Sequence, residues 1–170
     1  MIREAEIEDC SRIAEIHVFG WRSAYMEFIS MEFLFSKFTV IKREEKFREY
    51  LSDKSGCNKT YVFEEDKIIK AFMTTGNCRD EDKSSKTFEL EGIYVDPLFQ
   101  RQKIGAQLVN YCIDEAISND KNEITLWVFE KNIASINFYR KMGFAPDGKI
   151  KLMEAFNENA IRMSRKILRI

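Results

Sequence analysis

The hydrophobic and polar positions of the chain follow different periods, and the changes of period predict its elements. Residues 1–5 (MIREA) predict a short first strand. Asp9 follows and is suited to cap a helix in which apolar residues such as Ile13 are spaced to face a core. This helix continues to Met26, with Gly20 as the place where it could bend.

The next part of the chain changes from helical to β-rich patterning. Residues 30–38 and the charged amphipathic stretch 40–51 predict two further helices. The runs 60–65 and 67–76 predict two strands, and the pair Asp66–Lys67 between them predicts a hairpin turn.

A polar loop and a third strand open the second half of the chain. The loop covers residues 78–86, and the strand over 87–95 is ended by Asp96 and Pro97. A helix facing a core follows, because apolar or small residues recur there at every fourth position: Ile104, Leu108, Cys112 and Ala116.

The remaining elements complete the predicted fold class. Residues 123–129 predict a strand, and 134–142 predict a short helix that Gly143 ends in the left-handed conformation. The tail 160–168 alternates well enough for a last strand. This order of strands and helices predicts a mixed α/β domain in which helices cover a central sheet. Because repeats and Pro-, Gly- or Ser-rich linkers are absent, we expect a single domain over 1–170.

Composition and charge narrow the classes of function. The 27 Lys and Arg residues balance 28 Asp and Glu residues, which argues against a general nucleic-acid binder. No apolar run approaches the roughly 20 residues that cross a bilayer, and the polar, acidic N-terminus is unlike a signal peptide. We therefore expect a cytoplasmic protein that binds neither nucleic acid nor membrane.

Cysteine and histidine usage argues against a metal site. His17 is the only histidine, which excludes a His-based metal cluster, and a Ser-His-Asp hydrolase would have to use that residue. No two cysteines stand at C-x-x-C spacing, so we expect reduced thiols rather than a zinc or redox motif at Cys10, Cys57, Cys78 and Cys112.

The stretch VDPLFQRQKIGAQL joins a predicted strand to a predicted helix through a basic turn. The first N–H groups of a helix have no partner and the helix dipole is positive there, which suits a phosphate. Gly105 lacks the Cβ that would hold phosphate oxygens away from the backbone. Arg101 and Lys103 add charge and Gln100 adds a neutral donor. Taken alone, the same pattern also fits a plain helix cap.

A second segment, EKNIASINFYRKMGF, follows the next predicted strand. Together the two segments resemble the paired signatures of the GNAT superfamily of N-acetyltransferases. The first signature, Q/R-x-x-G-x-G/A, is matched by Gln100, Lys103 and Gly105, with Lys103 in place of the first glycine. The opening IREAEIEDCSRIAEIHVFGWRSAY is similar to that of many bacterial members, so the resemblance covers nearly the whole chain. The second signature is matched by Asn132, Ser135, Tyr139, Gly143 and Phe144.

The resemblance implies an acyl-CoA N-acyltransferase fold, with a central, mostly antiparallel sheet flanked by helices. In such a fold the sheet splays between the strands here predicted over 87–95 and 123–129. The pantetheine arm of acetyl-CoA would lie in that gap and pair with the backbone of Ile93, Tyr94 and Val95. The residues that match the pyrophosphate loop are Gln100, Arg101, Gln102, Lys103, Ile104, Gly105 and Ala106. The cations among them could also be merely solvated.

Several further positions match residues with roles in the family. Asn132 and Ser135 match the signature that contacts the coenzyme arm, although Asn132 could also be a helix cap. Tyr139 matches the tyrosine that points at the thioester sulfur, with a core aromatic as the alternative. Glu89 stands where some members carry a general-base glutamate. Glu91, a second candidate for this base, points to the same sheet face, where two acids would be costly without partners.

His17, Trp21 and Tyr25 recur every fourth residue on the first predicted helix. In the family this helix helps to wall the acceptor pocket, and an aromatic wall suits a cationic or aromatic amine. The alternative is a packed aromatic stripe.

The reaction implied is transfer of the acetyl group of acetyl-CoA to a primary amine, by direct attack in a ternary complex. A free alkyl amine has a pKa of about 10.4, so a base or a desolvating pocket must supply the neutral nucleophile. The acceptor stays open between a small molecule and a peptide, and a homodimer rests on analogy alone. Two other classes remain: a non-catalytic acyl-CoA sensor of the same fold, and an interaction protein without coenzyme, which the basic turn disfavours.

Overall fold

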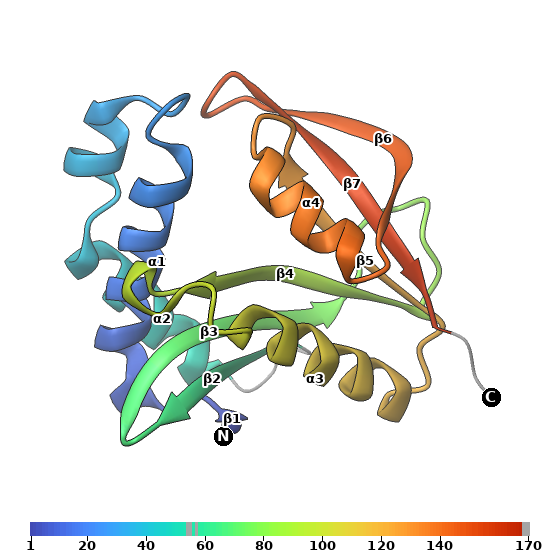
Figure 1. Ribbon diagram of the computed structural model, residues 1–170, viewed down its shortest axis with the longest axis horizontal. Helices are drawn as coiled ribbons and strands as arrows, with labels where there is room; N and C mark the ends of the chain where they lie inside the picture. Colours follow the sequence, from blue (N-terminus) through green and yellow to red (C-terminus); the bar gives the residue numbers. More distant parts are fainter. Residues whose placement is uncertain (54–55, 57, 168–170) are drawn as a thin grey trace. The chain divides into compact units, whose positions relative to one another are not determined.

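The computed structural model describes residues 1–53, 56 and 58–167, and its strands form one sheet in the order β1-β2-β3-β4-β5-β7-β6 (Figure 1). The strands are β1 (Ile2–Glu4), β2 (Lys59–Glu65), β3 (Ile68–Asn77), β4 (Thr87–Val95), β5 (Glu123–Phe129), β6 (Ala145–Met153) and β7 (Glu158–Lys166). The helices are α1 (Cys10–Tyr25), α2 (Val40–Ser52), α3 (Ile104–Ser118) and α4 (Ile133–Lys141), with shorter turns at Ile7–Asp9, Phe33–Lys37 and Pro97–Phe99.

Strand directions fit the predicted sheet. β1 pairs antiparallel with β2, and β7 pairs antiparallel with both β5 and β6. β4 and β5 pair in parallel, as a crossover through α3 requires. The prediction of a mixed α/β fold with a mostly antiparallel sheet and flanking helices is therefore confirmed.

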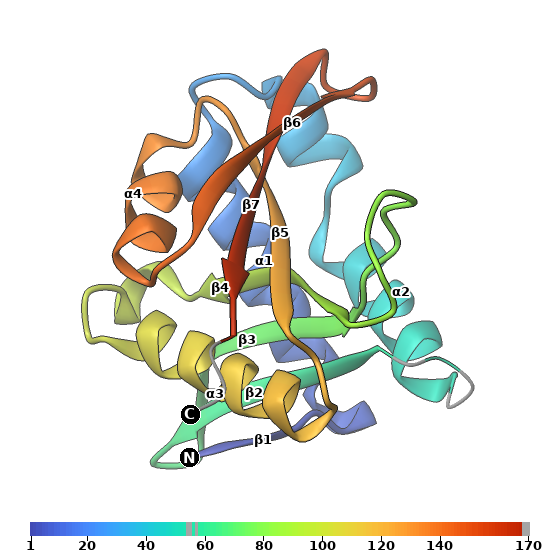
Figure 2. The ribbon, with the colours of Figure 1, turned by 90° about the vertical axis from the view of Figure 1, so that its right-hand side faces the viewer.

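Contacts divide the chain into two compact units. The first unit contains Met1–Thr74 and Ile93–Leu108, and the second contains Thr75–Gly92 and the chain from Val109 onward. In the first unit, α1 and α2 pack on β2 and β3, and β2 lies between β3 and β1 (Figures 1 and 2). Full burial of an Ile, Val or Phe side chain contributes roughly 1.5–3 kcal/mol to folding. The apolar core of this unit is formed by Cys10, Ile13, Ala14, Ile16, Phe47, Val62 and Phe72.

The predicted cap of α1 is wrong in its detail. Asp9 directly precedes α1, but its carboxylate makes no capping bond to the helix. Arg3 holds it instead, with Nη1 2.7 Å from Oδ2 and Nη2 3.0 Å from Oδ1. The N–H of Glu6 donates to the same carboxylate at 2.8 Å. The helix then continues past Gly20, where a Cβ would come within 3.2 Å of the Tyr94 ring, so this glycine permits a close approach.

The predicted hairpin between β2 and β3 is confirmed. Asp66 and Lys67 both have positive φ, 53° and 63°. A two-residue turn with this pair of conformations matches the right-handed twist of the strands it joins.

The second unit contains β5, β7 and β6, with α4 beside them (Figure 2). Arg162 of β7 is only 3% exposed and is surrounded by acids. Its Nη1 lies 2.6 Å from Oδ1 of Asp82, and its Nε lies 2.7 Å from Oδ2 of Asp147. These bonds join the 78–86 loop and β6 to β7. The patterning of the sequence did not single out β6, whose residues are mostly exposed.

Two helix predictions are confirmed in detail. The stripe of α3 is buried at each of its four positions, Ile104, Leu108, Cys112 and Ala116. Gly143 ends α4 with φ of 84°, and the N–H of Phe144 donates to the carbonyl of Tyr139 at 3.0 Å. This is the left-handed stop that glycine makes easy. Of the expected thiols, Cys10, Cys78 and Cys112 are free, and Cys57 lies outside the described residues.

Candidate active site

The turn before α3 has an unusual backbone. Arg101 and Lys103 both lie in the left-handed region, with φ of 63° and 62°. The carbonyl of Lys103 accepts the first helical bond, from the N–H of Gln107 at 3.1 Å. Left-handed residues other than glycine cost of order 1–3 kcal/mol each. The position where the family signature carries glycine is therefore one where glycine would remove strain.

The same turn presents free donors. Within the described part of the chain, no group accepts a hydrogen bond from the backbone N–H groups of residues 101–106. Gln100, Arg101, Gln102 and Lys103 are exposed. Bare amides, the positive end of a helix dipole and two exposed cations together make a geometry suited to a phosphate group.

Asp96 fixes the entry to this turn, a role that the sequence analysis did not assign. It is 4% exposed, and its Oδ1 accepts a bond from the N–H of Leu98 at 2.9 Å. Arg12 of α1 donates to its other oxygen. The turn is thus tied to α1 within the first unit. Asp followed by Pro at a strand end was the available signal.

The backbone of Ile93, Tyr94 and Val95 forms the end of β4 and belongs to the first unit. These side chains are partly buried. In the second unit, the pairing of β4 with β5 covers Thr87 to Glu89. The parallel ladder thus occupies only the beginning of β4.

Glu89 and Glu91 share one arginine. Glu89 is 7% exposed, and its carboxylate lies 3.1 Å from Nη2 and 3.2 Å from Nε of Arg79. Glu91 lies 3.6 Å from the same Nη2. Arg79 therefore supplies the partner that two acids on one strand face require. The signal in the sequence was a cation in the loop that precedes the strand.

Asn132, Ser135 and Tyr139 lie on or next to α4, in the second unit. Asn132 is the helix cap, because its Oδ1 accepts a bond from the N–H of Ser135 at 3.1 Å. The side-chain amide nitrogen of Asn132 donates to none of the described residues. Tyr139 is 8% exposed, and its ring centroid lies 5.8 Å from that of Phe144.

The structure brings His17, Trp21 and Tyr25 together around Tyr94, all in the first unit. Trp21 Nε1 donates to the Tyr94 hydroxyl at 3.1 Å, and the rings of His17 and Tyr94 lie 4.4 Å apart. Trp21 and Tyr25 meet edge to face at 4.9 Å. Burial lowers the pKa of His17 well below 6.5, and the charge of Arg43 lowers it further, so the imidazole is neutral.

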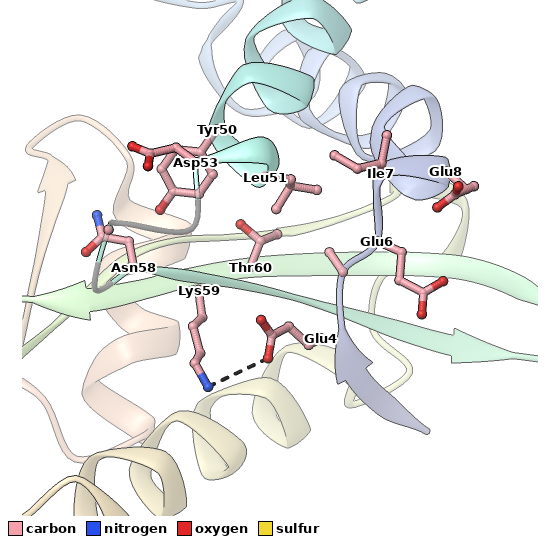
Figure 3. Close-up of a pocket in the computed structure, with 12 residues that line it drawn as sticks. Glu4, Glu6, Ile7, Glu8, Tyr50, Leu51, Asp53, Asn58, Lys59 and Thr60 are labelled. Carbon is pink, nitrogen blue, oxygen red and sulfur yellow. Dashed lines mark ion pairs between the residues drawn. The ribbon is translucent and has the colours of Figure 1, made fainter.

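A separate cavity of about 710 Å³ lies in the first unit, between the start of the chain, the end of α2 and the start of β2 (Figure 3). Its lining includes Glu4, Glu6, Glu8 and Asp53. Lys59 also lines it, with its Nζ 3.6 Å from Oε2 of Glu4. None of the predicted site residues lines it.

The described residues contain neither a ready metal site nor a membrane-spanning helix. No cluster of three or more His, Cys, Asp or Glu side chains there is arranged to hold a metal ion. No helix in the same residues combines the length and the apolar character needed to span a membrane.

The basic turn suits a phosphate-bearing ligand, and comparison with known proteins supplies the family. The model of the acetyltransferase (GNAT) family matches residues 8–144. The chain therefore belongs to this family, as the resemblance predicted. The uncharacterized N-acetyltransferase YuaI of Bacillus subtilis (strain 168) is 29% identical over 140 residues, which cover 82% of this chain and 76% of that protein.

Solved structures show the same fold. The PaiA N-acetyltransferase from Thermoplasma acidophilum, in complex with coenzyme A, has a TM-score of 0.78 and 22% identity over 98% of both chains. The yncA protein from Salmonella typhimurium, solved with its cofactor acetyl-CoA, has a TM-score of 0.75 and 20% identity, covering 100% of this chain and 95% of that one.

Proposed function

We propose that residues 1–170 act as one N-acetyltransferase domain, which binds acetyl-CoA and transfers its acetyl group to a primary amine by direct attack in a ternary complex. Membership of the acetyltransferase family supports the reaction class. Neighbours of the same fold that hold coenzyme A or acetyl-CoA support the cosubstrate.

The observation that carries the proposal is the turn over residues 101–106. Its backbone N–H groups have no acceptor among the described residues, and Arg101 and Lys103 project charge beside them. The pyrophosphate of the coenzyme would accept several of these N–H groups at once. Gly105 lies in the first turn of α3, where a side chain would stand between the phosphate and the backbone.

The remaining coenzyme contacts are proposed from the two units in turn. In the first unit, the backbone of Ile93, Tyr94 and Val95 would pair with the amides of the pantetheine arm. In the second unit, the parallel pairing of β4 with β5 covers Thr87 to Glu89. The unused amide nitrogen of Asn132 would donate to the same arm, and Ser135 would follow it on α4.

The chemical step uses this chain's own groups. The amine nitrogen bonds to the thioester carbonyl carbon, and backbone N–H groups of Ile93 or Val95 stabilise the oxyanion. The C–S bond then breaks. The amine gives up a proton to the carboxylate of Glu89 or Glu91, directly or through water, and the departing thiolate takes one from the hydroxyl of Tyr139. No covalent bond to the enzyme is required.

Calorimetry with acetyl-CoA tests the binding site. Gly105→Val should weaken binding by about tenfold or more, the loss expected when charge-assisted hydrogen bonds are removed. Asn110→Val, at an exposed position later in α3, controls for the poor helix propensity of valine and should bind normally. Unchanged affinity in Gly105→Val, with the fold intact by circular dichroism, would contradict the assignment.

Turnover is tested by release of free thiol with a panel of amines. Acetylation of any amine in the panel would support the proposed acetyltransferase activity. Binding of acetyl-CoA without turnover across the whole panel would favour the alternative of an acyl-CoA sensor.

A further inference from the structure

Arg43 of α2 has an unusual environment for an arginine. Its Cζ lies 5.3 Å from the ring centroids of both Phe38 and Phe47. Its Nε is buried and has no hydrogen-bond partner. No carboxylate in the described residues lies within ion-pair distance of its guanidinium. The fold therefore holds a half-buried cation for which the described chain supplies no anion.

This arrangement is costly, because arginine is rarely buried unless it is paired. Two other partly buried arginines of the first unit follow the rule. Arg3 pairs with Asp9 at 2.7 Å, and Arg12 pairs with Asp96. Burial lowers the pKa of Arg43, which reflects the cost of keeping its charge away from water. A charge held at a cost invites a functional explanation.

The neighbours of Arg43 cannot serve as its counter-ion. Burial raises the pKa of Tyr94 above 10.0, so its phenol stays protonated at neutral pH. His17 is a neutral imidazole, 8% exposed, and its Nδ1 is buried without a partner. The cluster thus contains two unpartnered nitrogens and a net positive charge, and an anion is the species that would complete it.

We propose that Arg43 determines acceptor specificity by binding the carboxylate of a free amino acid, whose amine is then acetylated. This inference rests on the proposed function and names its substrate class. The planar guanidinium matches a carboxylate through two parallel hydrogen bonds. Tyr94, which stands in the same cluster, lies at the end of β4 along which the coenzyme arm is proposed to run. An acceptor held at Arg43 would therefore lie beside that strand.

The same geometry argues against the cationic acceptor that an aromatic wall alone would suggest. Arg43 already occupies the position over the faces of Phe38 and Phe47. A second cation would find no free ring face to compensate for its lost hydration, and the charge of Arg43 would repel it. Diamines and polyamines are therefore expected to be poor substrates.

The test compares matched acceptors with the full-length protein. Thiol release is measured with proteinogenic L-amino acids, with the same amino acids as C-terminal amides, and with alkyl diamines. For the best acid, kcat/KM should exceed that of its amide by about 10- to 100-fold, the range of a charge-assisted hydrogen-bond pair. The difference should lie mainly in KM, because the carboxylate is bound equally before and during reaction.

Arg43→Met removes the charge and keeps a long apolar side chain against the phenylalanine rings. It should abolish the preference for acids over amides, leave acetyl-CoA affinity unchanged, and raise the melting temperature, because an uncompensated charge is lost. Arg43→Lys keeps the charge but lacks the planar guanidinium that makes two parallel hydrogen bonds, so it should retain part of the preference for acids over amides.

Arg22→Met is the matched control. Arg22 also lies over an aromatic ring, 4.4 Å from the centroid of Phe35, but its Nε donates to the carbonyl of Leu34 at 3.1 Å. Its loss should lower stability and leave acceptor preference unchanged.

Amides or diamines that react as well as acids, or an Arg43→Met variant that keeps the acid preference, would overturn the inference while the acetyltransferase assignment stands. If no amine reacts, calorimetric titration of the same amino acids decides. Binding to the parent protein but not to Arg43→Met supports the carboxylate site, and no binding to the parent refutes it. Absence of acetyl-CoA binding would instead refute the proposed function.

Discussion

The guanidinium of Arg79 contacts both carboxylate oxygens of Glu89, with Nη2 3.1 Å from Oε1 and Nε 3.2 Å from Oε2. The acid is buried, whereas the arginine side chain is 65% exposed. A buried carboxylate is thus held by a partner that can turn into solvent. In its proposed role as the base, Glu89 would become free to accept a proton when an approaching amine replaced the arginine.

Replacing this acid tests its role as a base. In Glu89→Gln the amide cannot take up the proton of the amine, so turnover should fall, most at low pH where free amine is scarce. The measurement is kcat/KM across pH with one acceptor. Glu81→Gln, which changes an exposed acid of the loop before β4, should behave like the parent. A parental profile in Glu89→Gln would exclude Glu89 and direct the same test to Glu91.

Glycine at the left-handed position of the turn should stabilise the protein. Lys103→Gly removes the strain of φ at 62° and should raise the free energy of unfolding by about 0.5–1 kcal/mol. Thermal unfolding would show a rise of roughly 2–4 °C per kcal/mol for a chain of this size. Gln102→Gly, next to it and without positive φ, should instead lose stability. Equal losses in both variants would contradict this account.

Low pH should weaken the ion pair between Arg3 of β1 and Asp9, which directly precedes α1. Burial acts to raise the pKa of Asp9, but hydrogen bonds from Arg3 and from the N–H of Glu6 outweigh it, so the net pKa lies below 3.8. Because the pKa of Asp9 is lower in the folded state, its bonds stabilise the fold at pH values above the pKa of the unfolded state, about 3.9. This stabilisation is lost as the pH falls through the pKa of the folded state.

Asp9→Asn should therefore cost about 1–2 kcal/mol at neutral pH, with the deficit closing as pH falls below about 4. Denaturant unfolding at a series of pH values measures this. A deficit that stays constant down to the lowest pH would show that the Asp9 carboxylate does not carry the effect.

Tyr139→Phe separates chemistry from packing. The change keeps the ring that lies 5.8 Å from Phe144 and removes only the hydroxyl. Turnover should fall by about 10²-fold, the low end for a positioned proton donor, since a thiolate is already a fair leaving group. Acetyl-CoA affinity and melting temperature should stay near those of the parent. Tyr111→Phe, on α3, controls for loss of a hydroxyl elsewhere.

Two results would remove Tyr139 from the mechanism. Full turnover in Tyr139→Phe would make it a core aromatic, with water or another group protonating the thiolate. Combined loss of coenzyme binding and stability would make its hydroxyl a structural hydrogen bond.

The features that the sequence predicted well depend on nearby residues. The fourfold spacing of Ile104, Leu108, Cys112 and Ala116 predicted the buried face of α3, because helical geometry alone places them together. The turn at Asp66 and Lys67 and the stop at Gly143 follow from local backbone preferences. The basic turn was predicted for the same reason, although its left-handed residues were not.

What the sequence missed depends on how the elements pack and where loops turn, even between residues only a few positions apart. Asp9 has the ideal position for a cap, but the pairing of β1 with β2 brings Arg3 into competition for its carboxylate. Arg79 meets Glu89 only because the loop turns back on the strand. The sequence pattern predicts that Arg43 is an ordinary charged position of an amphipathic helix. Its place over the ring of Phe38 follows from the packing of α2. Such pairings have no periodic signature.

The strand β6 determines how the sheet ends. It stands last in the strand order, its residues are mostly exposed, and the register with β7 shifts between Pro146 and Ile150. Proline offers no N–H to a further strand, an irregular register twists the edge away, and Lys149 and Lys151 would bring charge into any new ladder. These features disfavour the addition of another strand at this edge, so copies of the chain are not expected to associate by pairing their backbones along β6.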